Sequence, residues 1–154
     1  NCNKKVKLAL DKGLIPVYCN GETLEQRKAG QHFEVVKTQT EKALFTLSAE
    51  EIKKVVIAYE PVWAIGTGET ATPEQAQEIH AAIRAQLHAQ SPQAAVQTPL
   101  LHDGSMNAGN AAELLAQADI DGGLIGGAAL KAPDFMAIVH AAQHAAEFTR
   151  CLCV

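Results

Sequence analysis

The sequence is poor in aromatic residues, has no excess of positive charge and contains no long apolar run. Aromatic residues make up 5% of its 154 residues, and 13 lysines and arginines stand against 17 aspartates and glutamates. Without a basic cluster to neutralise a polymer of phosphates, nucleic acid is not an expected partner. Apolar runs such as 55–59 are far shorter than the roughly 20 residues of a membrane span, and no apolar signal segment follows the N-terminus. We therefore expect a cytoplasmic protein with no membrane partner.

The cysteines do not form the spaced pairs of a disulfide framework. Two of the four, Cys151 and Cys153, lie within the last four residues. Reduced thiols are therefore the expected state. The last four residues also fit a prenylation box, but no polybasic stretch precedes them, and we interpret residues 148–154 as a tail that frays after the last helix.

Hydrophobic residues make up 47% of the chain and charged residues 19%, which is typical of a folded domain with one packed core. Short apolar segments alternate along the chain with segments of helical periodicity. The expected strands are 14–19, 55–59, 96–101 and 123–125, and the expected helices after them are 32–47, 73–90, 107–117 and 134–147. A helix is also expected at 3–12, and a short helical stretch around Leu24. This alternation without hairpin signals predicts a parallel sheet with helical crossovers.

Glycines follow every expected strand, at Gly21, Gly66, Gly68, Gly104, Gly126 and Gly127. An open doubly wound sheet concentrates its ligand loops at one switch point, whereas a barrel brings every strand-to-helix loop to one rim. The distribution favours an α/β protein of the TIM (β/α)8 barrel class. Because a complete barrel needs about 250 residues, we expect the chain to form about half of one, with residues 1–147 as a single incomplete domain.

The most informative segment is 58–68, Ala-Tyr-Glu-Pro-Val-Trp-Ala-Ile-Gly-Thr-Gly. It places Glu60 at the end of an apolar strand and follows it with a loop in which Gly66 and Gly68 permit the close approach of a ligand. When such a loop closes over the carboxylate, water is excluded, the basicity of Glu60 rises, and it can take a proton from a carbon next to a carbonyl. The alternative is that Glu60 only pairs with a lysine of a neighbouring helix.

This segment is similar to the signature of the triosephosphate isomerase family. The resemblance continues in order through Gly21-Glu22-Thr23-Leu24, Asn110-Ala111-Ala112-Glu113-Leu114, Asp119-Ile120-Asp121-Gly122 and Gly126-Gly127. It corresponds to the C-terminal half of that family, about the last four βα units of the barrel. The activity it implies is that of an isomerase, which interconverts dihydroxyacetone phosphate and glyceraldehyde 3-phosphate through an enediol in glycolysis and gluconeogenesis.

The resemblance also assigns roles to individual residues. Glu60 is implied to be the catalytic base, and Pro61–Ala71 the lid that closes over it. The residues implied to hold the substrate phosphate through backbone N–H groups are Gly66, Ser105, Gly126 and Gly127, with a helix start expected after Gly127. No metal or organic cofactor is implied. The whole protein is expected to bind a small phosphorylated triose and to form a homodimer.

The chain departs from the family pattern in three respects. The family's Asn and Lys after its first strand and its His after its fourth belong to segments absent from this chain, so the chain alone is expected to be inactive. His102 stands where the family has a tyrosine whose hydroxyl helps to latch the lid. Asp103 follows it, and its negative charge near a bound phosphate is expected to weaken binding.

Two other functions stay open on the sequence alone. One is a half-barrel without isomerase activity that binds phosphorylated metabolites or assembles with itself. The other is a different phosphate-binding barrel enzyme, since a fold does not fix a function.

Some polar residues are expected to have no catalytic role. Arg84 and Asp121 match a structural ion pair of the family, and Asn20 is expected only to turn the chain. His140 and His144 stand four residues apart on an expected helix, but no third ligand accompanies them, so we interpret them as part of a solvated face.

Overall fold

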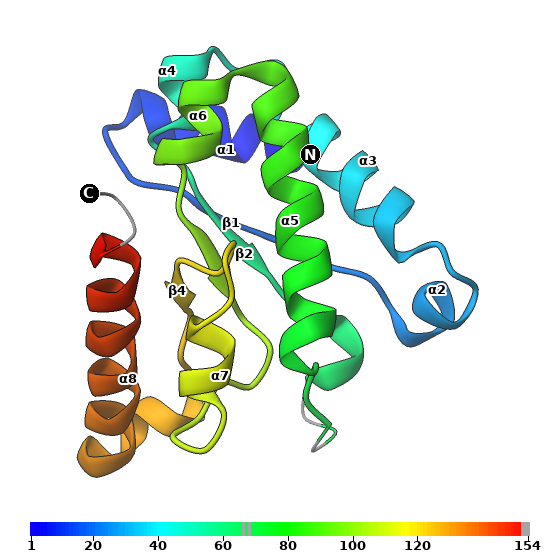
Figure 1. Cartoon of the computed structure of the whole chain (residues 1–154). Helices are drawn as coiled ribbons and strands as arrows, with labels where there is room; N and C mark the ends of the chain where they lie inside the picture. The colour runs from blue at the N-terminus through cyan, green and yellow to red at the C-terminus, as the bar shows by residue number, and fades with distance from the viewer. Residues whose placement is uncertain (66, 68, 152–154) are drawn as a thin grey trace.

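The computed structural model describes residues 1–65, 67 and 69–151, in which helices and parallel strands alternate (Figure 1). The elements, in chain order, are α1 (Cys2–Asp11), β1 (Val17–Asn20), α2 (Leu24–Lys28), α3 (His32–Leu44), α4 (Ala49–Ile52), β2 (Val56–Tyr59), η1 (Val62–Ala64), α5 (Pro73–Gln90), α6 (Pro92–Gln97), β3 (Leu100–His102), α7 (Ala111–Leu115), β4 (Gly122–Gly123), η2 (Gly127–Leu130) and α8 (Ala132–Cys151). The elements η1 and η2 are short 3-10 helices.

The strands form one sheet in sequence order, β1-β2-β3-β4, and each neighbouring pair is parallel. Cys19 lies opposite Ala58, and Tyr59 lies opposite His102. A doubly wound sheet reverses its strand order at a switch point, whereas a barrel adds each new strand beside the previous one. The observed order therefore confirms the expected α/β fold and corresponds to part of a (β/α)8 barrel.

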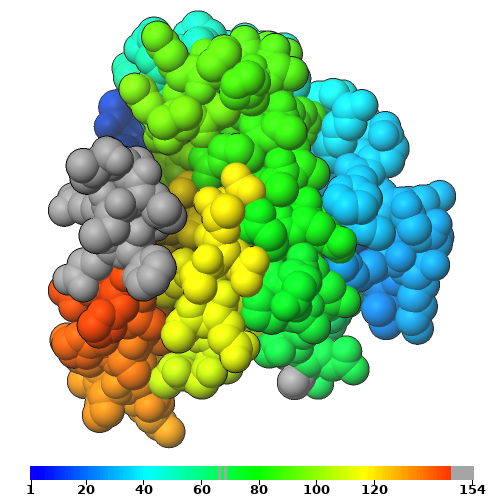
Figure 2. Space-filling view, viewed as in Figure 1, coloured from blue at the N-terminus to red at the C-terminus, as the bar shows by residue number. Residues whose placement is uncertain are grey.

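The helices cover one face of this sheet. Helix α1 packs on α3, α3 on α5, α5 on α7 and α7 on α8, and α5, α6 and α7 lie in front of the sheet in the view of Figure 2. Burial alternates along β1 as a consequence: Tyr18 and Asn20 are buried against helices, whereas Val17 and Cys19 face the other way and are exposed. The opposite face of the sheet is therefore less covered than the helical face.

Two apolar clusters hold the helices on the sheet. Fully buried members of the larger cluster include Leu44 of α3, Ile57 of β2 and Ile79 of α5. Burial of one such side chain contributes about 1.5–3 kcal/mol to the free energy of unfolding. The smaller cluster joins α7 and α8 through Leu114 and Ile138. It lies beside the loops that follow β3 and β4, and so supports the end of the sheet where those loops meet.

The strand predicted at 96–101 is wrong over its first half, because residues 92–97 form α6 and β3 begins only at Leu100. The side chain of Ser91 accepts a hydrogen bond from the backbone N–H of Ala94, and Pro92 occupies the first helical position, so both local signals start a helix. The strand predicted at 14–19 likewise begins later, at Val17, which leaves Pro16 outside the ladder.

Helix boundaries differ from the predictions in other places. The helix predicted at 107–117 is reduced to α7, because the side-chain oxygen of Asn107 accepts hydrogen bonds from the N–H groups of Gly109 and Asn110 and holds a turn there. The predicted helix 32–47 ends at Leu44, and β4 occupies 122–123 instead of 123–125. Helix α4 was not predicted. Helix α8 runs from Ala132 to Cys151, past residue 147 and into the segment interpreted as a tail.

In contrast, α5 has the predicted bounds, Pro73–Gln90. The side chain of Thr72 caps the N–H of Gln75, and the side chain of Gln75 caps the N–H of Thr72 in return. Among the described residues, no helix is both long enough and apolar enough to cross a membrane.

Candidate active site at the carboxyl ends of the strands

A cavity of about 360 Å³ opens where β2, β3 and β4 end. Its walls are formed by Glu60, Ile65, Asp103, Ser105, Met106, Asn107, Leu124, Gly126, Gly127 and Ala128. Four of the five residues implied by the resemblance, Glu60, Ser105, Gly126 and Gly127, thus line one cavity. The fifth, Gly66, lies outside the described residues. A larger groove of about 430 Å³ between α3 and α5 contains none of them.

Glu60 is held at the rim by the ends of two neighbouring strands. Its backbone N–H donates a hydrogen bond of 2.7 Å to the carbonyl of Asn20. Gly21 packs so closely on the backbone of Glu60 that a side chain at position 21 would overlap the Glu60 carbonyl, which is why glycine is needed there. Among the described ion pairs none involves Glu60, so the alternative in which it pairs with a helical lysine is not observed.

Ser105 has an unusual backbone conformation. Its φ of 60° is the only positive φ of a non-glycine residue in the described part of the chain. The carbonyl of Ser105 accepts hydrogen bonds from the side-chain amides of Asn107, at 3.5 Å, and Asn110, at 3.2 Å. Residues held in sparsely populated backbone conformations cost about 1–3 kcal/mol and cluster at functional sites. The loop after β3 therefore places Ser105 in the cavity wall in a backbone conformation that costs free energy.

Gly126 and Gly127 also line the cavity. A β-carbon added to either residue would meet no other atom within 4 Å. Within the described residues, the backbone N–H groups of Ser105, Gly126 and Gly127 make no hydrogen bond. The helix start expected after Gly127 is present only as η2, which has four residues. The hydrogen-bond donors in this wall are therefore individual backbone N–H groups. No long helix begins here to add the effect of its dipole.

Asp103 and Glu60 are the two carboxylates of the cavity. Burial, and to a smaller degree the negative charge of Glu60, together raise the pKa of Asp103 to about 6. The pKa of the Cys19 thiol at the end of β1 is also raised, first by burial and then by the charges of Asp103 and Glu60. Cys19, Glu60 and Asp103, at or just after the ends of three adjacent strands, therefore interact electrostatically.

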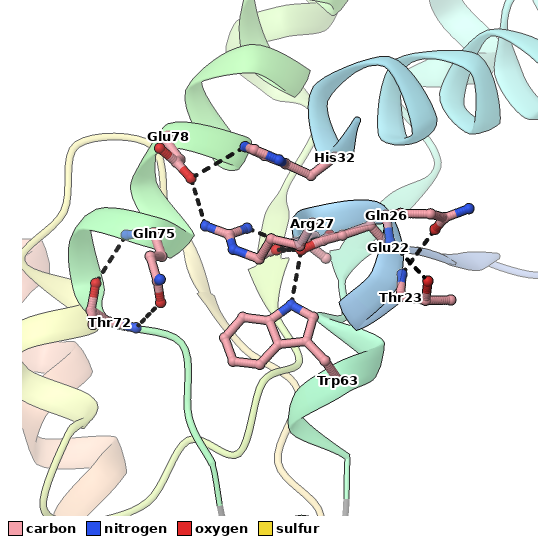
Figure 3. A network of polar contacts seen from close by, with 10 residues as sticks. Glu22, Thr23, Gln26, Arg27, His32, Trp63, Thr72, Gln75 and Glu78 are labelled. Atoms are coloured by element: carbon pink, nitrogen blue, oxygen red, sulfur yellow. Dashed lines mark hydrogen bonds and ion pairs between the residues drawn. The ribbon is translucent and has the colours of Figure 1, made fainter. Parts of the chain in front are cut away.

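Glu22, which the sequence analysis does not assign to the site, is fully buried. Its carboxylate accepts hydrogen bonds from the hydroxyl of Tyr59 at 3.0 Å, from the indole N–H of Trp63 at 2.9 Å and from the guanidinium of Arg27 at 3.0 Å. Figure 3 shows Arg27 of α2 and Trp63 of η1 converging on Glu22. Trp63 is the third residue after Glu60, so the network holds the start of segment 61–71.

Arg27 links this network to α5. It pairs with Glu22 on one side and with Glu78 at 2.7 Å on the other, and its guanidinium lies 5.5 Å from the centre of the Trp63 ring (Figure 3). Burial lowers the pKa of Arg27, but its hydrogen bonds to Glu22 and Glu78 and nearby negative charge outweigh burial and raise it. A buried carboxylate is stable only with such partners. The one signal in the sequence is the Thr23–Gln26 capping box, which starts α2 and turns Arg27 back toward Glu22.

His102 lies on the helical face of the sheet, away from the cavity. Its ring is buried beside those of Tyr59 and His80, and its Nε2 lies 3.3 Å from the carbonyl of Gly104. Burial lowers the pKa of His102 to about 4. The imidazole therefore takes part in packing under α5.

The remaining polar residues fall into two groups. Arg84 and Asp121 form the expected ion pair at 2.7 Å. Asn20 does not turn the chain: it is the last residue of β1, and its side chain donates to the hydroxyl of Thr40. His140 and His144 are exposed on α8. In the part of the chain that the structure describes, no three His, Cys, Asp or Glu side chains are placed to hold a metal ion.

Parallel strands in sequence order, helices on one face and a cavity at the carboxyl ends define a protein of the (β/α)8 barrel class, whose active sites lie at this end. The sequence model of the triosephosphate isomerase family matches residues 1–142. The chain belongs to the triosephosphate isomerase family.

Curated relatives named triosephosphate isomerase show the extent of the match. The protein of Herminiimonas arsenicoxydans is 58% identical over 139 residues, which are 90% of this chain and 56% of that protein. The protein of Delftia acidovorans is 60% identical over 139 residues, 90% of this chain and 55% of that protein. That of Pseudomonas putida is 55% identical over 140 residues, 91% and 56% of the two chains. The chain thus spans a little over half the length of these relatives.

Proposed function

We propose that this chain supplies the base and the phosphate-binding loops of an isomerase that interconverts dihydroxyacetone phosphate and glyceraldehyde 3-phosphate. One observation carries the proposal: Glu60, Ser105, Gly126 and Gly127, which are far apart in the sequence, line the same cavity. Membership of the triosephosphate isomerase family supports the same substrate pair.

In the proposed reaction, the Glu60 carboxylate takes a proton from the carbon next to the substrate carbonyl. The electrons of the broken C–H bond form a carbon–carbon double bond, and the carbonyl oxygen gains negative charge and then a proton, which gives an enediol. Glu60 returns its proton to the neighbouring carbon while the hydroxyl on the first carbon loses a proton, and the carbonyl forms there. The proton released by this hydroxyl balances the one that the first carbonyl oxygen took up. Closure of the lid is proposed to exclude water from this carboxylate, which favours the step because desolvation raises the basicity of a carboxylate. The chemistry moves protons only and needs no metal or organic cofactor.

The phosphate is proposed to lie between the free N–H groups of Ser105, Gly126 and Gly127, joined by that of Gly66. Pro61–Ala71 is proposed to close over the substrate as a lid. Its first turn is anchored through the hydrogen bond between Trp63 and Glu22, so closure can pivot beyond that point.

The other features of the whole protein follow the family. Residues 1–147 are proposed to act as one half of a barrel domain, followed by residues 148–154. A second half supplies the lysine and histidine that stabilise the developing oxyanion, and the complete protein is proposed to be a cytoplasmic homodimer. Without those groups, each worth about 10²- to 10³-fold in rate, the 154-residue chain alone is expected to have negligible isomerase activity.

The proposal is tested by joining this chain to an N-terminal half from a relative and assaying the conversion of dihydroxyacetone phosphate. Glu60→Gln should lower kcat by about 10²- to 10⁴-fold, since a general base contributes that much. Glu113→Gln, at an exposed glutamate of α7 outside the cavity, is the matched control and should leave kcat unchanged. If the joined protein binds a triose phosphate but never isomerises it, the chain is a phosphate-binding half-barrel. Isomerase activity of the 154-residue chain alone within tenfold of the joined protein would contradict the roles assigned to the second half.

A further inference from the structure

Asp103 and Glu60 occupy equivalent positions on neighbouring strands. Each follows the paired residues Tyr59 and His102 by one position, and the backbone N–H of Asp103 donates to the carbonyl of Tyr59 at 2.8 Å. Tyr59 and His102 are buried under the helices. Because side chains alternate along a strand, Glu60 and Asp103 both turn to the opposite face, where they line the cavity together with Ser105.

Among the described residues, no positively charged side chain forms an ion pair with Glu60 or Asp103. The titratable groups that face Asp103 are Glu60 after β2 and, at the end of β1, Cys19. Apart from Asp103 itself, no titratable side chain lines the cavity from the loops after β3 and β4. The other lining residues of these loops lie within 105–107 and 124–128.

Ser105, Gly126 and Gly127 line this small cavity together with Asp103, and their backbone N–H groups have no hydrogen-bond partner among the described residues. An anion held by them lies close to a carboxylate that forms no ion pair in the described part of the chain. In a cavity of this kind the repulsion between the two negative charges is poorly screened. The cavity therefore accepts an anion most readily when Asp103 carries a proton.

We propose that Asp103 couples anion binding to proton uptake, so that the cavity binds one anion together with one proton on the Asp103 carboxyl group. The balance is simple: ionised Asp103, one proton and the free anion give neutral Asp103 beside the bound anion. This inference rests on the anion-binding role proposed above for Ser105, Gly126 and Gly127, and it makes Asp103 a pH-dependent determinant of affinity. The pKa of Asp103, raised to about 6 by burial and by Glu60, places the transition just below neutral pH.

Sulfate is the probe for this coupling, because it stays a dianion from weakly acidic to weakly basic pH and adds no titration of its own. Its binding to the 154-residue chain is measured by calorimetry at constant ionic strength. The Kd should be about 10- to 100-fold higher at about pH 8 than at about pH 5, since a coupled proton changes affinity by up to tenfold per pH unit. Calorimetry in two buffers of different ionisation enthalpy should show uptake of close to one proton per sulfate at about pH 7.

Asp103→Asn should bind sulfate at about pH 8 as tightly as the unmodified chain binds it at about pH 5, with no uptake of a proton. Glu60→Gln removes the neighbouring charge and should move the midpoint of the pH dependence downward. Asp11→Asn, at an exposed position of α1, is the matched control and should keep the pH dependence of the unmodified chain. Circular dichroism of each variant, together with the retained affinity at acidic pH, shows that the fold is intact.

The outcomes separate this inference from the function on which it rests. Sulfate binding with the same Kd at both pH values overturns the coupling and leaves the anion site in place. Binding at neither pH, by the unmodified chain and by Asp103→Asn alike, overturns the anion-binding role of Ser105, Gly126 and Gly127 and the coupling with it.

Discussion

The indole N–H of Trp63 donates a hydrogen bond of 2.9 Å to the buried carboxylate of Glu22, 41 residues earlier in the chain. Trp63 belongs to η1, the first turn after Glu60, and Glu22 immediately precedes Thr23, the N-cap of α2. The same carboxylate also accepts from Tyr59, the residue before Glu60. One side chain thus positions the backbone on both sides of Glu60, and this relationship leads to the first prediction.

Glu22→Ala should destabilise the chain by about 3–5 kcal/mol, because it leaves the hydroxyl of Tyr59 and the indole N–H of Trp63 without an acceptor and leaves the part-buried Arg27 with Glu78 alone. Glu22→Gln keeps one oxygen acceptor and should cost about half as much. Urea denaturation followed by circular dichroism measures both values. The fluorescence of Trp63, the only tryptophan of the chain, reports whether the indole has lost its partner. Equal stability of both variants and the unmodified chain would show that the network contributes nothing.

Glu60→Asp in the protein joined to a second half should lower turnover by about 10²-fold and leave KM nearly unchanged. The shorter side chain draws the base back by about 1 Å, and misplacement of that size costs about this much in rate. The N–H groups proposed to hold the phosphate are untouched by this change. Steady-state kinetics check the prediction, and a change mainly in KM would mean that Glu60 binds substrate instead of moving its proton.

His80 and His102 should make the fold sensitive to acid. Burial lowers the pKa of His80 to about 3 and that of His102 to about 4, against the ordinary 6.5. Above about pH 6.5 these two histidines do not lower the free energy of unfolding. As the pH falls toward about 4 they lower it, because the unfolded chain then binds protons that the folded chain does not. At about pH 4.5 each histidine should lower the free energy of unfolding by about 2–3 kcal/mol relative to neutral pH.

The variant that tests this is His102→Phe, which keeps a ring in the space and removes the titration. Thermal unfolding at about pH 7.5 and about pH 4.5 should show a smaller acid loss for His102→Phe than for the unmodified chain. His88→Gln, at an exposed position of α5, is the control and should not reduce the loss. The contribution of Asp103, which has the opposite sign because its pKa is raised, cancels in the comparison. An acid loss unaffected by His102→Phe would contradict the assignment.

The purified 154-residue chain should self-associate at micromolar concentration. Strand β1 pairs only with β2, and β4 only with β3, so within the described residues each has an unpaired edge. Ile15 and Val17, beside the β1 edge, are 73% and 49% exposed. Unpaired edges flanked by exposed apolar side chains favour pairing between chains.

Replacing Ile15 and Val17 together by lysine should shift the chain toward monomer in size-exclusion chromatography with light scattering. Val96→Lys is the control, because Val96 is 82% exposed on α6 and away from the edge. A compact monomer that melts cooperatively without any substitution would contradict this prediction.

The sequence predicts those features that depend on neighbours along the chain. The start of α5 could be predicted from Thr72 and Pro73, because a helix cap is a contact between residues only three apart in the sequence. Glu60, Ser105 and Gly126 meet in one cavity because the carboxyl ends of parallel strands lie at one edge of the sheet. Residues 96–101 were predicted as a strand throughout, and the first half was wrong because a short run rich in apolar residues fits a helix as well as a strand. The Ser91 cap and Pro92 at the first helical position favour the helix α6.

Other properties were decided only by the tertiary structure. Nothing near Glu22 in the sequence indicates that Tyr59 and Trp63 will bind its carboxylate, because those contacts span about 40 residues. The identity of Asp103 was visible, but its pKa depends on the water excluded by the cavity and on the charge of Glu60 across the sheet. The sequence by itself determined the order of strands and helices and the residue types at the rim. Tertiary packing decided which polar groups lose water and which charges face one another, because solvent exclusion and Coulomb interactions depend on distances between segments that local pattern does not contain.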